Sequence, residues 1–201
     1  MNGLTMIPGV HHAAADSEDV AHPSKNPDTS GMQEFCMVKA WLGLGSNLQQ
    51  PLVQLRTAIR RLSDADGLEV LQISSFYQTP PWGVEKQDDF VNAVVKIETS
   101  LDSLSLLKVL QSIENAMGRE REGHRWGPRL IDIDLLLFGD QRCRSRELEL
   151  PHPRMHERAF VLVPLSELDV TLEIPGRGAI DSLLKQLDCS SIYRIDEGPQ
   201  T

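Results

Sequence analysis

Short apolar runs alternate with helical patterns along the chain from residue 37 onward. Residues 38–44 (VKAWLGL), 68–76, 90–97 and 130–138 are rich in β-branched, aromatic and other apolar side chains, and the first and last runs lead into glycine-containing turns. Runs of this length and composition are typical of β-strands. The pattern therefore predicts four strands.

Two segments between these strands place apolar residues at the spacing of one helix face. The first begins at Pro51, a residue suited to the first helical turn, and the second can be capped by Asp102 or Ser103 and stopped by Gly118. The two expected faces comprise Leu52, Leu55, Ile59 and Leu62 in the first segment, and Leu104, Leu107, Leu110, Ile113 and Met117 in the second.

The order of these elements is strand, helix, strand, strand, helix, strand. This order predicts an α+β fold with a ferredoxin-like split βαβ core in three α-β-α layers. Residues 141–201 are expected to add a loop, a short helix near 160–168, and a final strand and helix. Because no internal repeat or second core is visible, one domain is expected over residues 37–201.

Residues 1–36 differ in composition from the rest of the chain. They have no periodicity, almost no large apolar residue between positions 10 and 32, and a net charge of −4, which arises from Asp16, Glu18, Asp19, Asp28 and Glu34 against Lys25. Their histidines could form a metal-binding tract, but incidental histidines in a flexible segment are the simpler interpretation. We expect a disordered leader whose deletion leaves activity unchanged.

The composition excludes several classes of protein. The 201 residues carry a formal charge of −9, which argues against a protein that coats nucleic acid or an anionic membrane. Three separated cysteines without a CxxC pair argue against a disulfide scaffold and a zinc site, and no apolar run approaches the roughly 18 residues of a membrane span. We expect a cytoplasmic monomer that binds neither nucleic acid nor membrane.

Asp132 and Asp134 form the strongest candidate site. They alternate with apolar residues such as Ile133, so both carboxylates lie on one face of the predicted strand. A divalent cation would offset their repulsion, and such oxygen ligands suit Mg²⁺ completed by water and substrate phosphates. The alternative is an edge strand with two solvated acids; Leu136 and Phe138, expected on the same face, argue against it.

Arginines surround this strand. Nine arginines and no lysine lie between positions 119 and 158, namely Arg119, Arg121, Arg125, Arg129, Arg142, Arg144, Arg146, Arg154 and Arg158. Arginine is suited to bidentate contact with phosphate oxygens. Arginines combined with paired carboxylates are the arrangement that phosphoryl transfer needs.

Two further features are weaker. The turn at 43–47 (GLGSN) could cradle a phosphate but lacks the P-loop and dinucleotide fingerprints, so a plain turn with Ser46 or Asn47 as a helix cap is an equal alternative. Proline, asparagine and aromatic residues at 79–83 (TPPWG), 90–92 and 151–160 could surround a flat heterocycle if they meet in space.

Five blocks of the chain match a known family in order. They are LGLGSNL at 42–48, SSFYQTPPWG at 74–83, FVNA at 90–93, RWGPRLIDIDLLLFG at 125–139 and PHPRMHERAFVLVPL at 151–165. On these blocks, residues 38–187 closely resemble the 6-hydroxymethyl-7,8-dihydropterin pyrophosphokinases, enzymes of folate biosynthesis that have a ferredoxin-like core.

The resemblance implies transfer of the terminal pyrophosphate of ATP to the hydroxymethyl oxygen of the pterin, with release of AMP. It implies two Mg²⁺ ions held by Asp132 and Asp134, and a mobile loop in which Arg119 and Arg121 close on the phosphates as catalytic residues. The implied ATP contacts are Gln111, Arg121, Arg125, Trp126, Arg129, Ile133, His152 and Arg158. The implied pterin contacts are Gly45, Thr79, Pro80, Trp82, Phe90, Asn92 and Phe160, with the ring stacked between the two phenylalanines.

The chain departs from the family pattern at four positions. Phe90 stands where a tyrosine is familiar, and Trp82 replaces a small aliphatic residue. Glu147 and Glu149 stand where the family can offer arginine and threonine, so no nucleotide contact is implied at these two positions.

Two other functional classes share some of these features. A metal-dependent nucleotide phosphohydrolase would use the same carboxylates and arginines but would release phosphate without pterin. A non-catalytic nucleotide-binding or RNA-binding ferredoxin-like module would expose an aromatic sheet and a basic face, which the net charge and the buried-looking strands disfavour.

Overall fold

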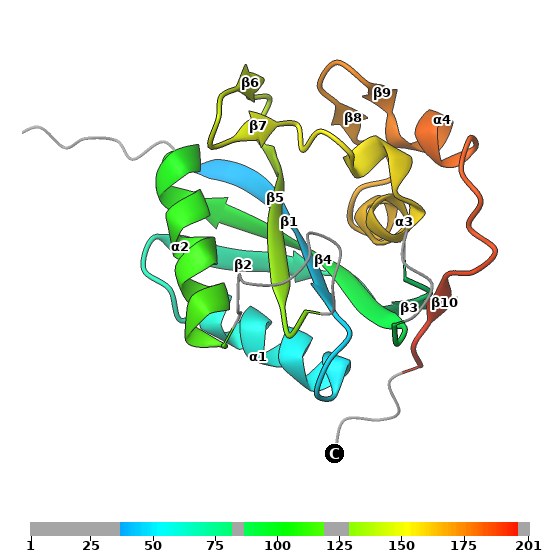
Figure 1. Cartoon of the computed structure of the whole chain (residues 1–201). Coiled ribbons are helices and arrows are strands. Elements are labelled where there is room, and N and C mark those ends of the chain that lie inside the picture. Colours follow the sequence, from blue (N-terminus) through cyan, green and yellow to red (C-terminus); the bar gives the residue numbers. More distant parts are fainter. Residues whose placement is uncertain (1–36, 82–86, 119–128, 197–201) are drawn as a thin grey trace, which may run out of the picture. The chain divides into compact units, whose positions relative to one another are not determined.

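The computed structural model describes residues 37–81, 87–118 and 129–196 (Figure 1). The prediction of a disordered leader at 1–36 lies outside these residues. Within the described part, no helix has the length and apolar character needed to cross a membrane.

Six strands form one sheet in the order β10-β3-β4-β1-β5, with β2 paired to β4 beside β3. All of the pairs are antiparallel. The strands are β1 (Val38–Ser46), β2 (Leu68–Ile73), β3 (Tyr77–Thr79), β4 (Phe90–Thr99), β5 (Asp132–Phe138) and β10 (Tyr193–Arg194). Since β4 lies between β1 and β2, and β1 lies between β4 and β5, the two βαβ units are split, as the element order predicts.

The helices cover both faces of this sheet. Figure 1 shows α1 (Pro51–Ser63) and α2 (Ser103–Ala116) on one face and α3 (Ala159–Leu168) on the other. A one-turn helix η1 (Met155–Glu157) precedes α3, and α4 (Ile180–Leu184) packs with it against the same face. The predicted α+β core in three layers is therefore confirmed.

The C-terminal region is more elaborate than predicted. It contains two small hairpins, β6 (Cys143–Arg144) with β7 (Glu149–Leu150), and β8 (Glu173–Ile174) with β9 (Gly178–Ala179). The last element is a strand, β10, rather than the predicted helix, and it extends the main sheet by pairing with β3.

Helix α2 begins at the predicted cap but turns a different face to the core. The Asp102 side chain accepts hydrogen bonds from the N–H groups of Leu104 and Ser105, each 3.0 Å long, and such a cap contributes about 1 kcal/mol. Leu106 and Leu110 are fully buried, whereas Leu104, expected on the buried face, is 41% exposed. The expected face is wrong at this end because Ser103 and Leu106, rather than Leu104 and Leu107, are the buried positions of the first two turns.

The predicted strand at 68–76 ends early: β2 stops at Ile73, and a break separates it from β3, which begins only at Tyr77. At the break, Ser74 Oγ accepts a hydrogen bond from the Val94 N–H (2.9 Å) and donates one to the Ser75 carbonyl (2.8 Å). Side-chain bonds of this kind replace the regular ladder, and both segments still pair with β4.

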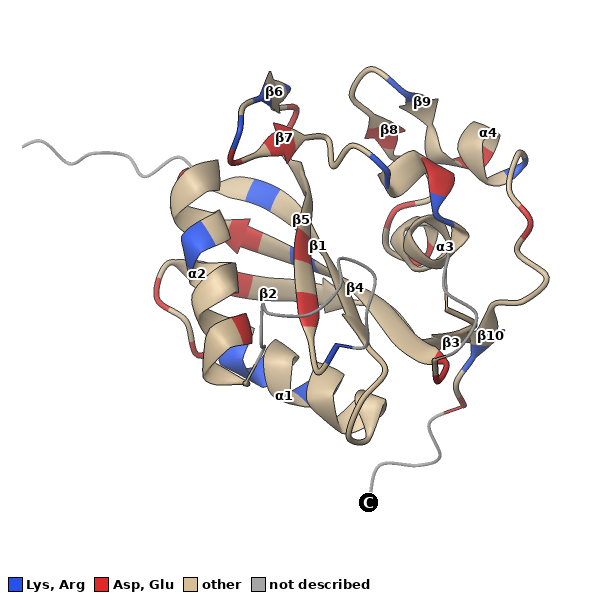
Figure 2. Cartoon of the chain, in the orientation of Figure 1, with Lys and Arg blue, Asp and Glu red and all other residues tan. Residues whose placement is uncertain are grey.

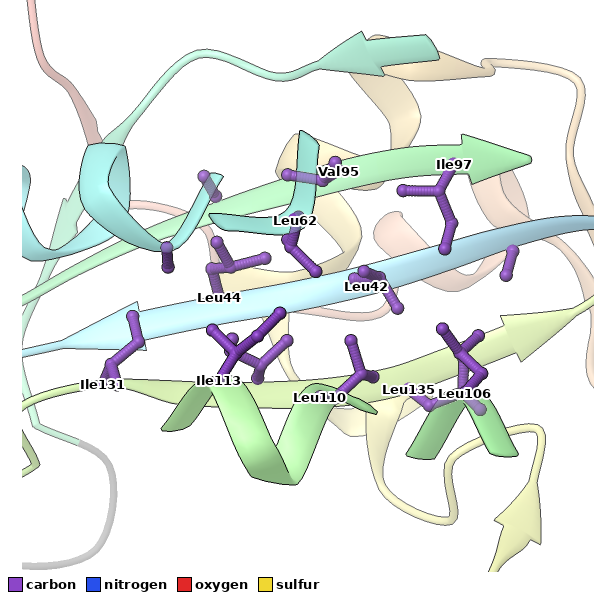
Figure 3. Packing of buried hydrophobic residues seen from close by; sticks show 14 of the residues in the cluster. Leu42, Leu44, Leu62, Val95, Ile97, Leu106, Leu110, Ile113, Ile131 and Leu135 are labelled. Atoms are coloured by element: carbon purple, nitrogen blue, oxygen red, sulfur yellow. The ribbon is translucent and has the colours of Figure 1, made fainter. Parts of the chain in front are cut away.

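Strand β5 separates an apolar face from a polar one. Ile131 and Leu135, labelled in Figure 3, join the cluster under α1 and α2. Ile133 belongs to the same cluster, while Leu136 joins the cluster under α3. A bulge skips Leu136 in the pairing with β1. The bulge turns Phe138 to the face covered by α1 and α2. The prediction that Phe138 continues the aspartate face is therefore wrong.

Strand β5 is also the last strand of the sheet on its side, so the expectation that it would not be an edge strand is wrong. Its aspartates are nevertheless not simply solvated, because they line a cavity together with residues from 152–161, which include the start of α3.

Candidate active site

A cavity of about 250 Å³ lies on the sheet face covered by α3. Its lining comes from β1, β4 and β5, from the end of β3, and from residues 152–161. Two glycines of β1 make room for it. A Cβ at Gly43 would come within 3.3 Å of the Leu136 side chain, and one at Gly45 within 3.0 Å of Asn92 Oδ1.

The two aspartates of β5 face this cavity, as the strand alternation predicts. They pair with β1 opposite the same glycines, Asp132 with Gly45 and Asp134 with Gly43. Figure 2 shows the acidic segments of β5 in the middle of the molecule. Alternation and the absence of side chains on the neighbouring strand thus combine to direct both carboxylates into one space.

Cationic side chains meet these carboxylates from two other segments. Arg129 forms an ion pair with Asp132, and Arg158 Nη1 lies 3.7 Å from Asp134 Oδ2. Burial and the nearby Asp132 charge raise the pKa of Asp134 to about 7, although the two arginines act in the opposite direction. A cation placed beside the two carboxylates would oppose this shift, because it favours their charged forms.

His152 is held in one orientation beside Asp134. Its Nδ1 accepts a hydrogen bond from the Arg154 N–H (3.3 Å), and its Nε2 lies 3.9 Å from Asp134 Oδ2. Burial, assisted by the Arg158 charge, lowers the pKa of His152 to about 4. The ring is thus neutral near pH 7, and because Nδ1 is an acceptor, Nε2 carries the proton toward the cavity.

The other end of the cavity, formed by β4 and the end of β3, is less charged. Phe90, Pro80 and Phe160 line it together with Asn92, whose Nδ2 donates to Thr79 Oγ1 over 2.8 Å. Asn92 and Thr79 are 7% and 4% exposed. A heterocycle placed here would contact aromatic and proline surfaces and would find oriented polar groups at its edge.

The structure brings most of the predicted site residues together. Those that line the one cavity are Gly45, Thr79, Pro80, Phe90, Asn92, Arg129, Asp132, Asp134, His152, Arg158 and Phe160. Trp82, Arg119, Arg121, Arg125 and Trp126 lie outside the described residues.

Gln111 and Ile133 are not part of this cavity. Ile133 is 4% exposed and packs in the cluster under α1 and α2, and its N–H donates to Glu114 Oε1 over 2.7 Å. Gln111 lies on α2, on the same side of the sheet. Their predicted ATP contacts would therefore require the nucleoside to reach beyond the cavity.

Several residues at the site are not among the contacts predicted individually from the sequence. Gln87 and Arg154 also line the cavity. Glu114, only 2% exposed, binds the β5 backbone next to the aspartates; its position four residues after Leu110 on the buried stripe of α2 could have revealed it.

Asn47 also has no predicted role at the site, and it does not cap α1, although the turn at 43–47 suggested it as a possible helix cap. The residue at the N-cap is Gln50, with a left-handed backbone (φ 61°) and no side-chain capping bond. Asn47 is 2% exposed and binds Arg129, Gln87 and Asp88 instead. Nothing in the local sequence signals these partners, because they lie about 40 and 80 residues away along the chain.

The donor set at the carboxylates is compatible with Mg²⁺. Within the described ranges no group of three or more histidine, cysteine or acidic side chains forms a metal cluster. Two carboxylates in a cavity that arginines also line still fit this ion, which commonly takes one or two carboxylates and completes its shell with water and phosphate oxygens.

Comparisons with known proteins agree with this geometry. Residues 41–170 match the model of the family described as 7,8-dihydro-6-hydroxymethylpterin-pyrophosphokinase (HPPK). A 2-amino-4-hydroxy-6-hydroxymethyldihydropteridine pyrophosphokinase of Haemophilus influenzae is 45% identical over 160 residues, which cover 80% of this chain and 99% of the relative. One of Methylorubrum extorquens is 46% identical over 160 residues, covering 80% of this chain and 100% of the relative.

Solved structures support the fold. A crystal structure of Plasmodium falciparum HPPK-DHPS superimposes with a TM-score of 0.61 at 16% identity, over 77% of this chain and 46% of that longer chain. Together, the family model and the relatives of similar length establish that the chain belongs to the 7,8-dihydro-6-hydroxymethylpterin-pyrophosphokinase family.

Proposed function

We propose that this protein transfers the terminal pyrophosphate of ATP to the hydroxymethyl oxygen of 6-hydroxymethyl-7,8-dihydropterin. The products are the pterin diphosphate and AMP, in a step of folate biosynthesis. The observation that carries the proposal is that one cavity joins a pair of carboxylates flanked by cationic groups to a slot lined by Phe90 and Phe160. Family membership supports the same reaction.

The charged end of the cavity is assigned to the phosphates. Arg129 and Arg158 would bind phosphate oxygens, with His152 donating through Nε2 as a neutral group. A charge-assisted bond from an arginine is roughly twice as strong as a neutral one. Arg119, Arg121, Arg125 and Trp126, outside the described residues, are proposed to complete the phosphate site.

The less charged end is assigned to the pterin. Phe90 and Phe160 would stack on the ring, and Asn92 with the Thr79 segment would bind its polar edge. The glycine at position 45 allows Asn92 to approach β1. Trp82 is proposed to contribute to the same wall.

Asp132 and Asp134 are the residues that would hold Mg²⁺, with two ions expected. When bound, the metal would offset the phosphate charge and lower the pKa of the attacking hydroxyl. His152, with a pKa of about 4, is a weak base near pH 7. The contribution of the chain is therefore mainly positioning and electrostatic stabilisation rather than proton abstraction by a strong base.

The remaining expectations concern the surroundings of this reaction. A monomeric state, a cytoplasmic location and the adenosine contacts of Gln111 and Ile133 stay predictions.

A single assay tests the proposal. The protein is incubated with ATP and Mg²⁺, with and without the hydroxymethyl dihydropterin, and AMP, ADP and phosphate are separated. AMP formation that requires the pterin is expected. Phosphate release without pterin would instead indicate a phosphohydrolase, and formation of ADP or absence of turnover would reject the proposal.

A further inference from the structure

Asn47, at the end of β1, fixes the segment that leads into the aspartate strand. Its backbone N–H donates to the Arg129 carbonyl (3.1 Å), and its Oδ1 accepts from the Arg129 N–H (2.7 Å). These two bonds hold the backbone carbonyl and the backbone N–H of Arg129, three residues before Asp132. The Arg129 side chain lines the cavity and pairs with Asp132.

The other side of the same amide holds the segment that leads into β4. Asn47 Nδ2 donates to Gln87 Oε1 and to the Asp88 carbonyl, each over 3.3 Å. Gln87 lines the cavity, and Phe90 follows two residues after Asp88. One buried side chain therefore connects the segment before the aspartates with the segment before the stacking phenylalanine.

The chemistry of these partners requires an amide. The Arg129 N–H can only donate, so Oδ1 must face it, and the Asp88 carbonyl can only accept, so Nδ2 must face that side. Aspartate would keep the acceptor but lose the donor, and alanine would lose both. The orientation of the amide is thereby fixed by two backbone groups.

We propose that Asn47 is a positioning residue that couples the two halves of the cavity, so that occupation of either half prepares the other. Asn47 acts through Arg129 and Gln87 and does not itself line the cavity. This inference rests on the proposed function, which assigns the halves to nucleotide and pterin. Coupling of this kind is a free energy shared between two sites, and it must act equally in both directions.

The test is a thermodynamic cycle measured by calorimetry on the full chain. The affinity for the hydroxymethyl dihydropterin is determined without and with a non-hydrolysable ATP analogue and Mg²⁺, and the affinity for the analogue without and with pterin. In the wild type each ligand should tighten the other by about 5- to 150-fold, the usual range for coupled sites. In Asn47→Ala this factor should fall to about one, the value at which neither ligand changes the affinity for the other.

Asn47→Asp separates the two arms. Because it retains the acceptor for Arg129, its affinity for the ATP analogue alone should stay nearer the wild-type value than that of Asn47→Ala. The coupling factor should nevertheless fall, since the donor to Asp88 is lost. If Asn47→Ala does not fold, the coupling factor of Asn47→Asp decides the question by the same criterion.

Thr99→Val is the matched control. Thr99 is fully buried near the opposite end of β4, and its Oγ1 joins two chain segments by donating to the Gly67 carbonyl (2.6 Å) and accepting from the Leu101 N–H (3.1 Å). This variant should lower the melting temperature but keep the wild-type coupling factor.

Three results would overturn the inference: an uncoupled wild type, a wild-type coupling factor in Asn47→Ala, or an equal loss in Thr99→Val. The proposed function is judged separately. Pterin-dependent AMP formation by the wild type would still support that function if only the coupling failed.

Discussion

The two faces of strand β5 differ in chemical character. On the α1 and α2 side, Ile131, Ile133 and Leu135 are at most 4% exposed and pack in the main core. On the α3 side, Asp132 and Asp134 face a cavity with two arginines and a histidine. Side-chain alternation lets consecutive residues of one strand serve stability and chemistry in turn.

The comparison also shows an energetic asymmetry. The apolar face gains from burial, by roughly 25 cal/mol per Å² of apolar surface. The polar face holds a carboxylate whose pKa is raised because its charged form is poorly solvated and lies beside another acid. A site of this kind weakens the unliganded protein and gains stability when a cation and phosphates bind.

The largest expected effect comes from removing the Asp134 charge. Asp134→Asn should reduce turnover by at least about 1,000-fold, roughly 4 kcal/mol of transition-state stabilisation, because a proposed Mg²⁺ ligand is lost. The melting temperature of the unliganded protein at pH 8 should not fall, since a disfavoured charge is removed. Steady-state kinetics and thermal unfolding measure the two effects, and near-normal turnover would refute the metal assignment.

Truncation of a core leucine should produce the opposite result. Leu110 lies on α2 and is fully buried in the cluster between the sheet and helices α1 and α2. Leu110→Ala should cost about 2–5 kcal/mol of unfolding free energy. At a temperature where the variant is folded, the KM values for ATP and pterin should stay near wild type. Urea unfolding and kinetics test this, and a selective rise of one KM would show that the two faces are not separate.

Removal of the Asn92 amide should affect one substrate only. Loss of a buried hydrogen-bonding partner costs about 1–3 kcal/mol, so Asn92→Ala should raise the KM for pterin by about 5- to 150-fold. The KM for ATP should be nearly unchanged. Similar increases in both values would contradict the division of the cavity into two ends.

The smallest expected effect is on the pH dependence of stability. The raised pKa of Asp134 means that the folded state binds more protons than the unfolded state between about pH 4 and 7, so this group lowers stability as pH rises through that window. The depressed pKa of His152 acts in the opposite sense between about pH 4 and 6.5, where stability is lost as pH falls.

These two contributions should partly cancel in the wild type. Asp134→Asn should therefore show a melting temperature that rises more steeply from pH 4 to 6.5 than that of the wild type. The measurement is unfolding of the unliganded protein at constant ionic strength. Identical pH profiles would show that the Asp134 pKa is not raised.

Periodicity alone predicted the frame that carries the site. The alternation around Ile133 correctly placed both aspartates on one face, and the element order gave the split βαβ core. These features depend on local repeats of two or 3.6 residues, which are visible in a single sequence.

Features that depend on pairing between distant segments could not be predicted in this way. The bulge opposite Trp41 and Leu42 redirected Phe138, and only the strand register reveals it. The partners of Asn47 are likewise set by the folded chain, so a local interpretation of the turn suggested a helix cap. The family resemblance predicts ATP contacts for Gln111 and Ile133. Both residues lie on the side of the sheet covered by α1 and α2 rather than in the cavity.

The most direct test of the central claim is the fate of the β-phosphorus of ATP. ATP labelled at this position is incubated with Mg²⁺ and the hydroxymethyl dihydropterin, and the label is located among the products of the wild type and of Asp134→Asn. If the polar face of β5 carries out pyrophosphate transfer, the wild type will place the label on the pterin, in an amount equal to the AMP formed, and the variant will place almost none there. Label retained in ADP, or equal transfer by the variant, would contradict the account.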